Sequence, residues 1–402
     1  LTATHVRTEG DLELAWIHGI PEAETGLGLT GWGTKQARTG RMSSLSGILN
    51  GDIDAFGRVH QLVFGVTGST ARTTYQAFGI DAASIAPIGN VYDYDGGFPR
   101  PDFTSDVIVD MHGEATEFGV YGAAQIRATD QLSLIGGLRL NWWNGEEAWD
   151  GVVQEYSYDA IATPYAGFTY DFNDIYTAYG SVTSIYKPQL YQDADGNYLD
   201  PRFGYNYELG VKASLADGGL SASAAVFQTD QRDVGEWVAY DAVAGRDVYR
   251  LIDGTRTRGF ELEAAGALTE RWNASLGYTY RYSEDRDGAE LYTNQPRNSL
   301  KVATSYRVPG VLDDRLTLGG AMRWQSATDS LVFVSEIEQP SVRQDPYAVF
   351  DVTAKYDLAE EASLVLSINN VLDKKYYSST GFYDTVVYGD GLSAELLLRA
   401  RF

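Results

Sequence analysis

The chain lacks several features by which proteins are often classified. Its 402 residues include no cysteine and only 3 methionines, and no uninterrupted apolar run reaches about 18 residues. Without cysteine there are no disulfides and no thiolate metal ligands. Without a long apolar run there is no membrane-spanning helix, although a membrane-spanning strand needs only about ten residues of alternating polarity.

Positive charge is also scarce, with 31 basic residues against 55 acidic ones and a formal net charge of -24. This balance disfavours nucleic acid as a partner, because phosphates need lysine and arginine. The acidic balance is compatible with cations or polar surfaces as partners, or it serves only to keep the loops solvated. The histidines lack the spacing of a zinc helix motif, so we expect neither an enzyme nor a cofactor. They are His5, His18, His60 and His112.

Glycine and aromatic residues are abundant, with 43 glycines, 28 tyrosines, 15 phenylalanines and 8 tryptophans. This composition favours strands, tight turns and aromatic girdles over helices. Apolar and polar residues alternate with the period of two that indicates a strand. In the last strand, one face carries Leu392, Ala394, Leu396, Leu398, Ala400 and Phe402. The same alternation recurs at 132–143, 205–213, 272–282 and 316–325.

Short turns and long polar connections alternate along the chain, as in hairpins whose two ends face different compartments. Short turns are expected at 54–57, 129–130, 173–174, 217–218, 269–270, 310–314 and 359–361. Long connections are expected at 80–114, 145–150, 187–204, 233–247, 284–298, 329–345 and 377–390. Residues 1–20 predict one extended strand or a strand with a bulge, and 42–49 and 61–67 predict two more strands. We therefore predict an all-β fold, a transmembrane antiparallel β-barrel of about 16 strands forming one domain over residues 1–402.

The alternating faces fit lipid better than a soluble core. A soluble β-sandwich, the competing interpretation, would bury its apolar faces, and two sheets of this total length would need a very large interior. A membrane barrel instead turns apolar residues outward and polar residues into the lumen, with aromatic residues near the strand ends. Phe402 would then end the last strand at the membrane interface.

A sequence motif near the end of the chain narrows the fold to a family. Residues 368–377 read Ile-Asn-Asn-Val-Leu-Asp-Lys-Lys-Tyr-Tyr. This resembles the penultimate strand of the TonB-dependent outer-membrane receptors, whose last strand ends in phenylalanine. Residues 184–189 and the Trp142-Trp143 pair resemble the ferric-siderophore receptors of that family. Other segments that resemble family patterns are 117–121, 204–212, 258–263 and 295–300.

The resemblance implies energised uptake of a ferric siderophore across the outer membrane of a Gram-negative cell. The implied partners are the siderophore, the lipid and the TonB complex of the inner membrane, and a monomer is expected. Family members carry a plug domain inside a barrel of about 22 strands. We find no plug-like segment in 1–402, which indicates a fragment or a barrel trimmed by whole hairpins. The alternative is a passive, porin-like channel of about 16 strands with an acidic mouth.

Ligand recognition in such receptors resembles an aromatic-lined bowl on the outer face. We predict ligand contacts from aromatic residues in the loops and at strand ends: Tyr94, Phe98, Trp143, Trp149, Trp237, Tyr240 and Tyr383. The competing interpretation is that they are interfacial anchors or loop-packing residues. Asp193, Asp195 and Asn197 imitate the start of a calcium loop but lack its later glutamate, so a cation site competes there with an ordinary turn.

Overall fold

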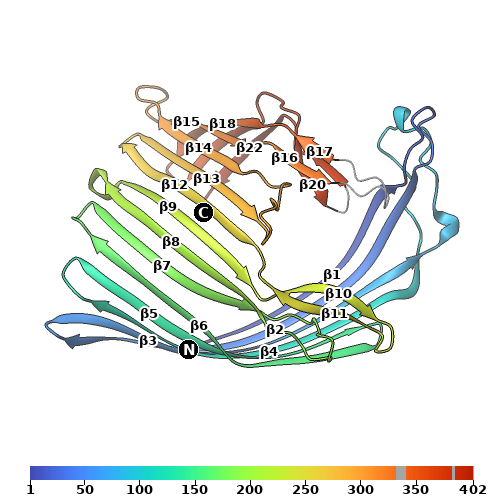
Figure 1. Ribbon diagram of the computed structural model, residues 1–402. Helices are drawn as coiled ribbons and strands as arrows, with labels where there is room; N and C mark the ends of the chain where they lie inside the picture. Colours follow the sequence, from blue (N-terminus) through green and yellow to red (C-terminus); the bar gives the residue numbers. More distant parts are fainter. Residues whose placement is uncertain (332–340, 383–384, 402) are drawn as a thin grey trace.

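One antiparallel sheet of 16 strands dominates the computed structural model, which describes residues 1–331, 341–382 and 385–401 (Figure 1). Across the sheet the strands are β1 (Thr2–His18), β2 (Thr30–Ala55), β3 (Arg58–Ile80), β4 (Phe103–Arg127), β5 (Leu132–Trp149), β6 (Val152–Asp171), β7 (Tyr176–Lys187), β8 (Arg202–Leu215), β9 (Leu220–Arg232), β12 (Arg256–Thr269), β13 (Trp272–Glu284), β14 (Asn298–Arg307), β15 (Leu316–Gln325), β18 (Tyr347–Ala359), β19 (Ala362–Asn369) and β22 (Ser393–Ala400). The predicted class and strand number are confirmed.

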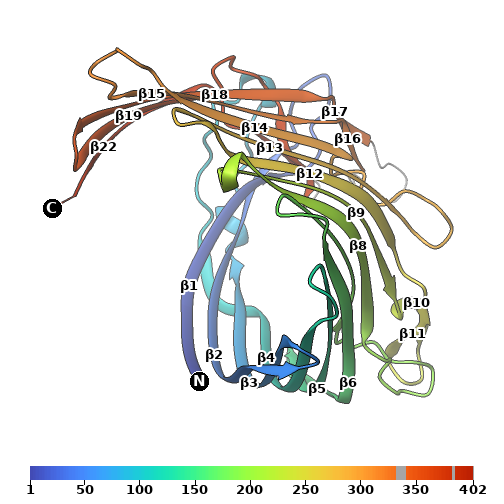
Figure 2. The same ribbon diagram turned by 90° about the vertical axis from the view of Figure 1, so that its left-hand side faces the viewer.

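The sheet curls into an open arc, seen from its short-turn end in Figure 2. Each strand lies beside the next one in the main sheet, but β1 pairs only with β2 and β22 only with β19 in the described part of the chain. A pore in lipid needs every strand edge paired, because unpaired backbone groups cannot be satisfied in hydrocarbon. The described residues therefore do not form the closed, porin-like channel that was the alternative.

Three small hairpins lie within the connections of the main sheet. They are β10 (Val234–Asp241) with β11 (Arg246–Ile252), β16 (Thr328–Leu331) with β17 (Ser341–Gln344), and β20 (Tyr377–Phe382) with β21 (Thr385–Tyr388). Single turns of 3₁₀ helix are η1 (Ala82–Ser84), η2 (Val91–Asp93) and η3 (Ala216–Gly218). No helix in the described ranges has the length and apolarity needed to cross a bilayer.

The two ends of the sheet differ in their connections. At one end, called here the short-turn end, the strands join through brief turns such as Phe56–Gly57. Both of these residues have left-handed backbone, with φ of 51° and 74°, and this pair matches the twist of a tight hairpin. The opposite end, called the long-loop end, carries the three small hairpins and the connections 19–29, 81–102 and 188–201.

Two predicted connections are shorter than the sequence indicated. The expected long connection at 145–150 is wrong, because β5 continues to Trp149 and turns through Asp150 and Gly151 into β6. The expected irregular segment at 80–114 is wrong at its C-terminal boundary, because β4 already begins at Phe103. Polar residues continue both strands beyond the membrane, where water satisfies their side chains and the paired backbone satisfies itself. The runs at 42–49 and 61–67 likewise lie within the longer strands β2 and β3.

One face of the sheet is apolar and uncovered. Directly paired residues share a face, and Leu45, Gly68, Phe118 and Trp142 form one such row across β2 to β5. Leu45 is 53% exposed and Phe118 is 44% exposed. We call this the lipid face, and the opposite, polar face the lumen face. The buried apolar side chains in the described residues are scattered: Leu29, Ala77, Ala148, Tyr158, Leu199 and Val349.

Candidate functional site

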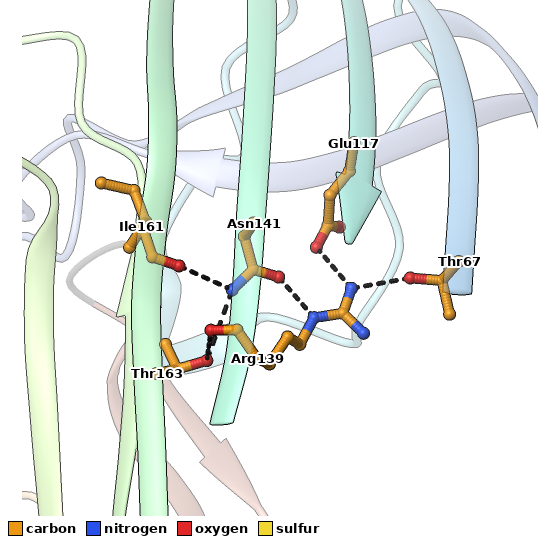
Figure 3. A network of polar contacts seen from close by, with 6 residues as sticks. All are labelled: Thr67, Glu117, Arg139, Asn141, Ile161 and Thr163. Carbon is orange, nitrogen blue, oxygen red and sulfur yellow. Dashed lines mark hydrogen bonds and ion pairs between the residues drawn. The ribbon is translucent and has the colours of Figure 1, made fainter. Parts of the chain in front are cut away.

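The lumen face of β3 to β6 is marked by a polar network around Arg139 (Figure 3). The Arg139 guanidinium donates to Thr67 Oγ1 at 2.8 Å and contacts the Glu117 carboxylate at 3.2 Å. It also donates to Asn141, whose amide donates to Thr163 Oγ1 at 3.3 Å. Asn141 is only 1% exposed. Buried polar groups need such partners, so this network fixes which face of each strand is polar.

Beyond this network, towards the long-loop end, the lumen face becomes aromatic. Trp143 is paired directly with Glu117 on β4 and with Tyr158 on β6, so all three share the lumen face. Tyr156 pairs with Gly145 and lies on the same side. A side chain at Gly145 would collide with the Tyr156 ring, since an added Cβ would lie 2.4 Å from its Cζ.

A one-residue bulge in β6 makes this placement possible. Asn141 pairs with Ile161 but Trp143 pairs with Tyr158, so β6 carries one more residue than β5 between these pairs. Ala160 in the bulge has φ of 52°. An extra residue shifts the side-chain alternation by one, and β6 therefore presents Thr163 to the lumen below the bulge and Tyr158 above it.

The same aromatic surface continues across β3, β2 and β1. Tyr75 on β3 pairs with Met111, which in turn pairs with Trp149. Trp16 and Trp32 pair directly across β1 and β2 on the lumen face. We call these residues the aromatic wall: Trp16, Trp32, Tyr75, Trp143, Trp149, Tyr156 and Tyr158.

Arg38 supplies a positive charge within the aromatic wall. Its guanidinium carbon lies 5.0 Å from the centre of the Tyr75 ring, and it donates to Gln36 Oε1 at 2.6 Å. Arg38 pairs directly with Tyr75, so it shares the lumen face. A cation held against aromatic faces suits a ligand that offers flat apolar surface and oxygen acceptors.

Tyr158 also fixes the loops above the wall. Its hydroxyl oxygen lies 2.8 Å from the carbonyl oxygen of Gln189 and 2.9 Å from that of Leu199, so it bridges both ends of the 188–201 connection. The Gln189 side chain is 6% exposed. It donates to the Asp233 carbonyl at 2.9 Å and accepts from the Gly235 amide at 3.2 Å. The 188–201 connection and the β10–β11 hairpin are therefore held together at this point.

The candidate cation loop serves as a turn in this assembly. One oxygen of the Asp193 carboxylate accepts from the backbone amides of Asp195 and Asn197, both at 2.9 Å. These bonds, with that of Asn197 the strongest, hold the pKa of Asp193 below its usual value. Within the described ranges, no group of three or more histidine, cysteine or acidic side chains is placed to hold a metal ion.

The same turn supports the β10–β11 hairpin. Arg246 donates to the carbonyl of Ala194 at 3.1 Å, and the rings of Tyr191 and Tyr249 stack with their centres 4.2 Å apart. These contacts position the hairpin that carries Trp237, whose indole donates to Asp247 at 2.8 Å.

The predicted ligand residues and the terminal Phe402 fall into four groups. Trp143 and Trp149 belong to the aromatic wall, and Trp237 and Tyr240 lie exposed on β10, at 56% and 60%. Tyr94 follows η2, and Phe98 lies against Gly31, where an added Cβ would come within 2.5 Å of its ring. Tyr383 and Phe402 lie outside the described residues. The structure unites the first pair with Trp16, Trp32, Tyr75, Tyr156 and Tyr158, which were not predicted.

Comparison with protein families identifies one match over most of the chain. The model described as "TonB dependent receptor-like, beta-barrel" matches residues 10–371. It covers the aromatic wall and the main sheet apart from the first part of β1 and the whole of β22.

Curated relatives and a solved structure agree with this match. The ferric-pyoverdine BN7/BN8 receptor of Pseudomonas putida is 34% identical over 376 residues, covering 90% of this chain and 44% of that protein. The ferripyoverdine receptor of Pseudomonas aeruginosa is 31% identical over 359 residues, covering 87% and 43%. The crystal structure of that outer-membrane receptor bound to ferripyoverdine superimposes with a TM-score of 0.89 at 28% identity, covering 99% of this chain and 53% of that one. The chain thus spans less than half the length of these curated relatives.

Proposed function

Because the chain belongs to the TonB-dependent receptor β-barrels, we propose that it is the barrel portion of a receptor that takes up a ferric siderophore of the pyoverdine class. The family consists of outer-membrane transport receptors and not of enzymes. The identity of 34% to a ferric-pyoverdine receptor supports the substrate class. We further infer that residues 1–402 form one unit that makes up part of the receptor barrel, with no plug among them, and that uptake is coupled to the TonB complex through parts of the receptor outside this chain.

The aromatic wall is the observation that carries this proposal. Ferric chelates offer flat, partly apolar surfaces and few ionic groups, so they are recognised best by large rigid rings with a small number of polar partners. Tryptophan and tyrosine provide such area at a low entropic cost. The wall lies on the lumen face beyond the membrane-spanning band, where a ligand arriving from outside meets the barrel. Trp237 and Tyr240, exposed on the hairpin held by Gln189, are proposed as further contacts.

Binding of iron-55-labelled ferric pyoverdine to the full-length receptor tests the proposal. Replacing Trp143 and Trp149 with alanine should weaken binding about tenfold to a hundredfold, because aromatic anchors contribute roughly 1–3 kcal/mol in all. Trp272→Ala is the matched control, since Trp272 begins β13 at the short-turn end. Equal affinities of the double variant and the control would refute the role of the wall. No binding by the wild-type receptor would refute the substrate class.

A further inference from the structure

Three arginines stand in one row on the outside of the barrel. Arg7 on β1 pairs directly with Arg41 on β2, which pairs directly with Arg72 on β3. Directly opposite residues have their Cβ atoms about 5 Å apart on the same face. The three guanidinium groups therefore project side by side from neighbouring strands.

The row lies on the lipid face, just beyond the membrane-spanning band, which is the apolar part of that face up to the row of Leu45, Gly68, Phe118 and Trp142. Arg41 and Arg72 are four residues beyond Leu45 and Gly68, which pair with each other in the row that also contains Phe118 and Trp142. Four residues span about 13 Å along a strand, and less in height because barrel strands are tilted. The polar headgroup layer adds about 5–8 Å to each side of the hydrocarbon. A long arginine side chain at this position reaches that layer.

The positive charge of the row is only partly balanced by the protein. Arg7 contacts Glu9 and Arg72 contacts Glu114, each at 2.9 Å, and the two arginine side chains remain 56% and 70% exposed. Arg41 lies between two arginines and makes no ion pair in the described residues. Like charges directly opposite each other destabilise a sheet. Such a row is stabilised when an external anion lies between the guanidinium groups.

We propose that Arg7, Arg41 and Arg72 bind the phosphate groups of a lipid in the outer leaflet. The planar guanidinium fork pairs with two phosphate oxygens at once, and neighbouring arginines can share one phosphorylated headgroup. The lipid, and not a soluble anion, is the occupant because the row faces outward directly above the apolar band that contacts its acyl chains.

The residues that continue this row on the next three strands limit the site to one flank of the barrel. Beyond Arg72 it continues through Glu114, Glu146 and Glu155 on β4, β5 and β6. Carboxylates repel phosphate, so the headgroup is held over β1 to β3 and kept away from β4 to β6. The glutamates on β5 and β6 also provide a matched control, because they lie at the same height on the lipid face as the arginines.

The test measures binding of lipid A carrying both phosphates, and of fully dephosphorylated lipid A, to the full-length receptor in nanodiscs. The wild-type receptor should retain the phosphorylated form at least about tenfold more tightly, as expected for charge-assisted hydrogen bonds. Replacing all three arginines with glutamine should remove this preference. Arg41→Lys should keep part of it, because the charge remains while the fork is lost. The Glu146→Gln/Glu155→Gln variant should keep all of it.

Three outcomes would overturn the proposal. They are a triple variant that keeps its preference for phosphorylated lipid, a control that loses it, and competition by free pyrophosphate with the affinity of the lipid. Unchanged binding of ferric pyoverdine shows that the triple variant is folded, because the arginines and the aromatic wall lie on opposite faces. If the receptor does not bind that siderophore, resistance of the barrel to heat in detergent gives the same control, so the two proposals fail separately.

Discussion

The two ends of the barrel are built on different principles. At the short-turn end, hairpins such as Phe56–Gly57 close through their own backbone conformation. At the long-loop end, connections far apart in sequence depend on single side chains, as where Gln189 joins the 188–201 connection to the β10–β11 hairpin. The short-turn end is therefore specified locally, whereas the long-loop end is specified by long-range contacts and is more sensitive to single substitutions.

Removing the Gln189 side chain should have the largest effect, because it should destabilise the long-loop end and leave the short-turn end unchanged. Gln189→Ala leaves the Asp233 carbonyl and the Gly235 amide without their partner, at a cost of about 2–3 kcal/mol. Hydrogen exchange of residues 234–252 in the full-length receptor should then rise by about two orders of magnitude, with no change in turns such as 56–57. Gln192→Ala on the same connection is the control. Unchanged exchange in the hairpin would show that the long-loop end is held elsewhere.

Glycine substitutions in two matching turns should have a smaller effect, equal at both ends. Gly57 and Gly151 have φ of 74° and 86°, and no atom lies within 4 Å of an added Cβ at either. Alanine at each position should therefore lower the free energy of unfolding by about 1 kcal/mol through backbone strain alone. Gly51→Ala, in β2 and also without close neighbours, should be neutral in urea unfolding. A much larger cost at Gly151 would mean that long-range contacts hold even this turn.

The smallest effect should come from the Asp193 turn. Its carboxyl pKa is lowered by backbone hydrogen bonds, above all that of Asn197, so its contribution is complete above the unfolded pKa and is lost as pH falls through the folded one. Hydrogen exchange of residues 188–201 should be steady from neutral pH down to about pH 4, after correction for intrinsic rates, and should then increase. Asp193→Asn should remove this pH dependence. Asp195→Asn, whose carboxylate accepts no hydrogen bond in the described structure, should preserve it.

The difference between the ends also explains what the sequence could predict. Local alternation predicts the strands and the turn at 54–57. It also predicts that the alternate apolar residues from Leu132 to Trp142 point outward. The extension of β5 to Trp149 was missed because polar residues replace the apolar ones beyond the membrane. The open edges at β1 and β22 could not be read from local alternation at all, since pairing between distant strands leaves no local signal.

The candidate site was only partly predictable for the same reason. Trp143 and Trp149 stand out as aromatic residues near a strand end. Tyr156 and Tyr158 could not be assigned to the lumen, because the bulge at Ala160 reverses the alternation that places Thr163 there. Trp16 and Trp32 lie in stretches with mixed patterns, and only their direct pairing shows that they share a face. Continuing the alternation of β1 and β2 beyond the apolar band is the signal that would have found them.

The bulge in β6 has a consequence for how the aromatic wall can change. If β6 kept all its residues but ran through this point in simple alternation, Tyr156 and Tyr158 would face outward, while the strand below stayed in place. Deleting Ala160 itself would remove the bulge and keep Tyr158 opposite Trp143 on the lumen face. A substitution alters one contact, but loss of the bulge without loss of a residue exchanges a whole stripe of the wall. Gain or loss of a bulge at this point is therefore a route by which related receptors can present different lumen surfaces without rebuilding the barrel.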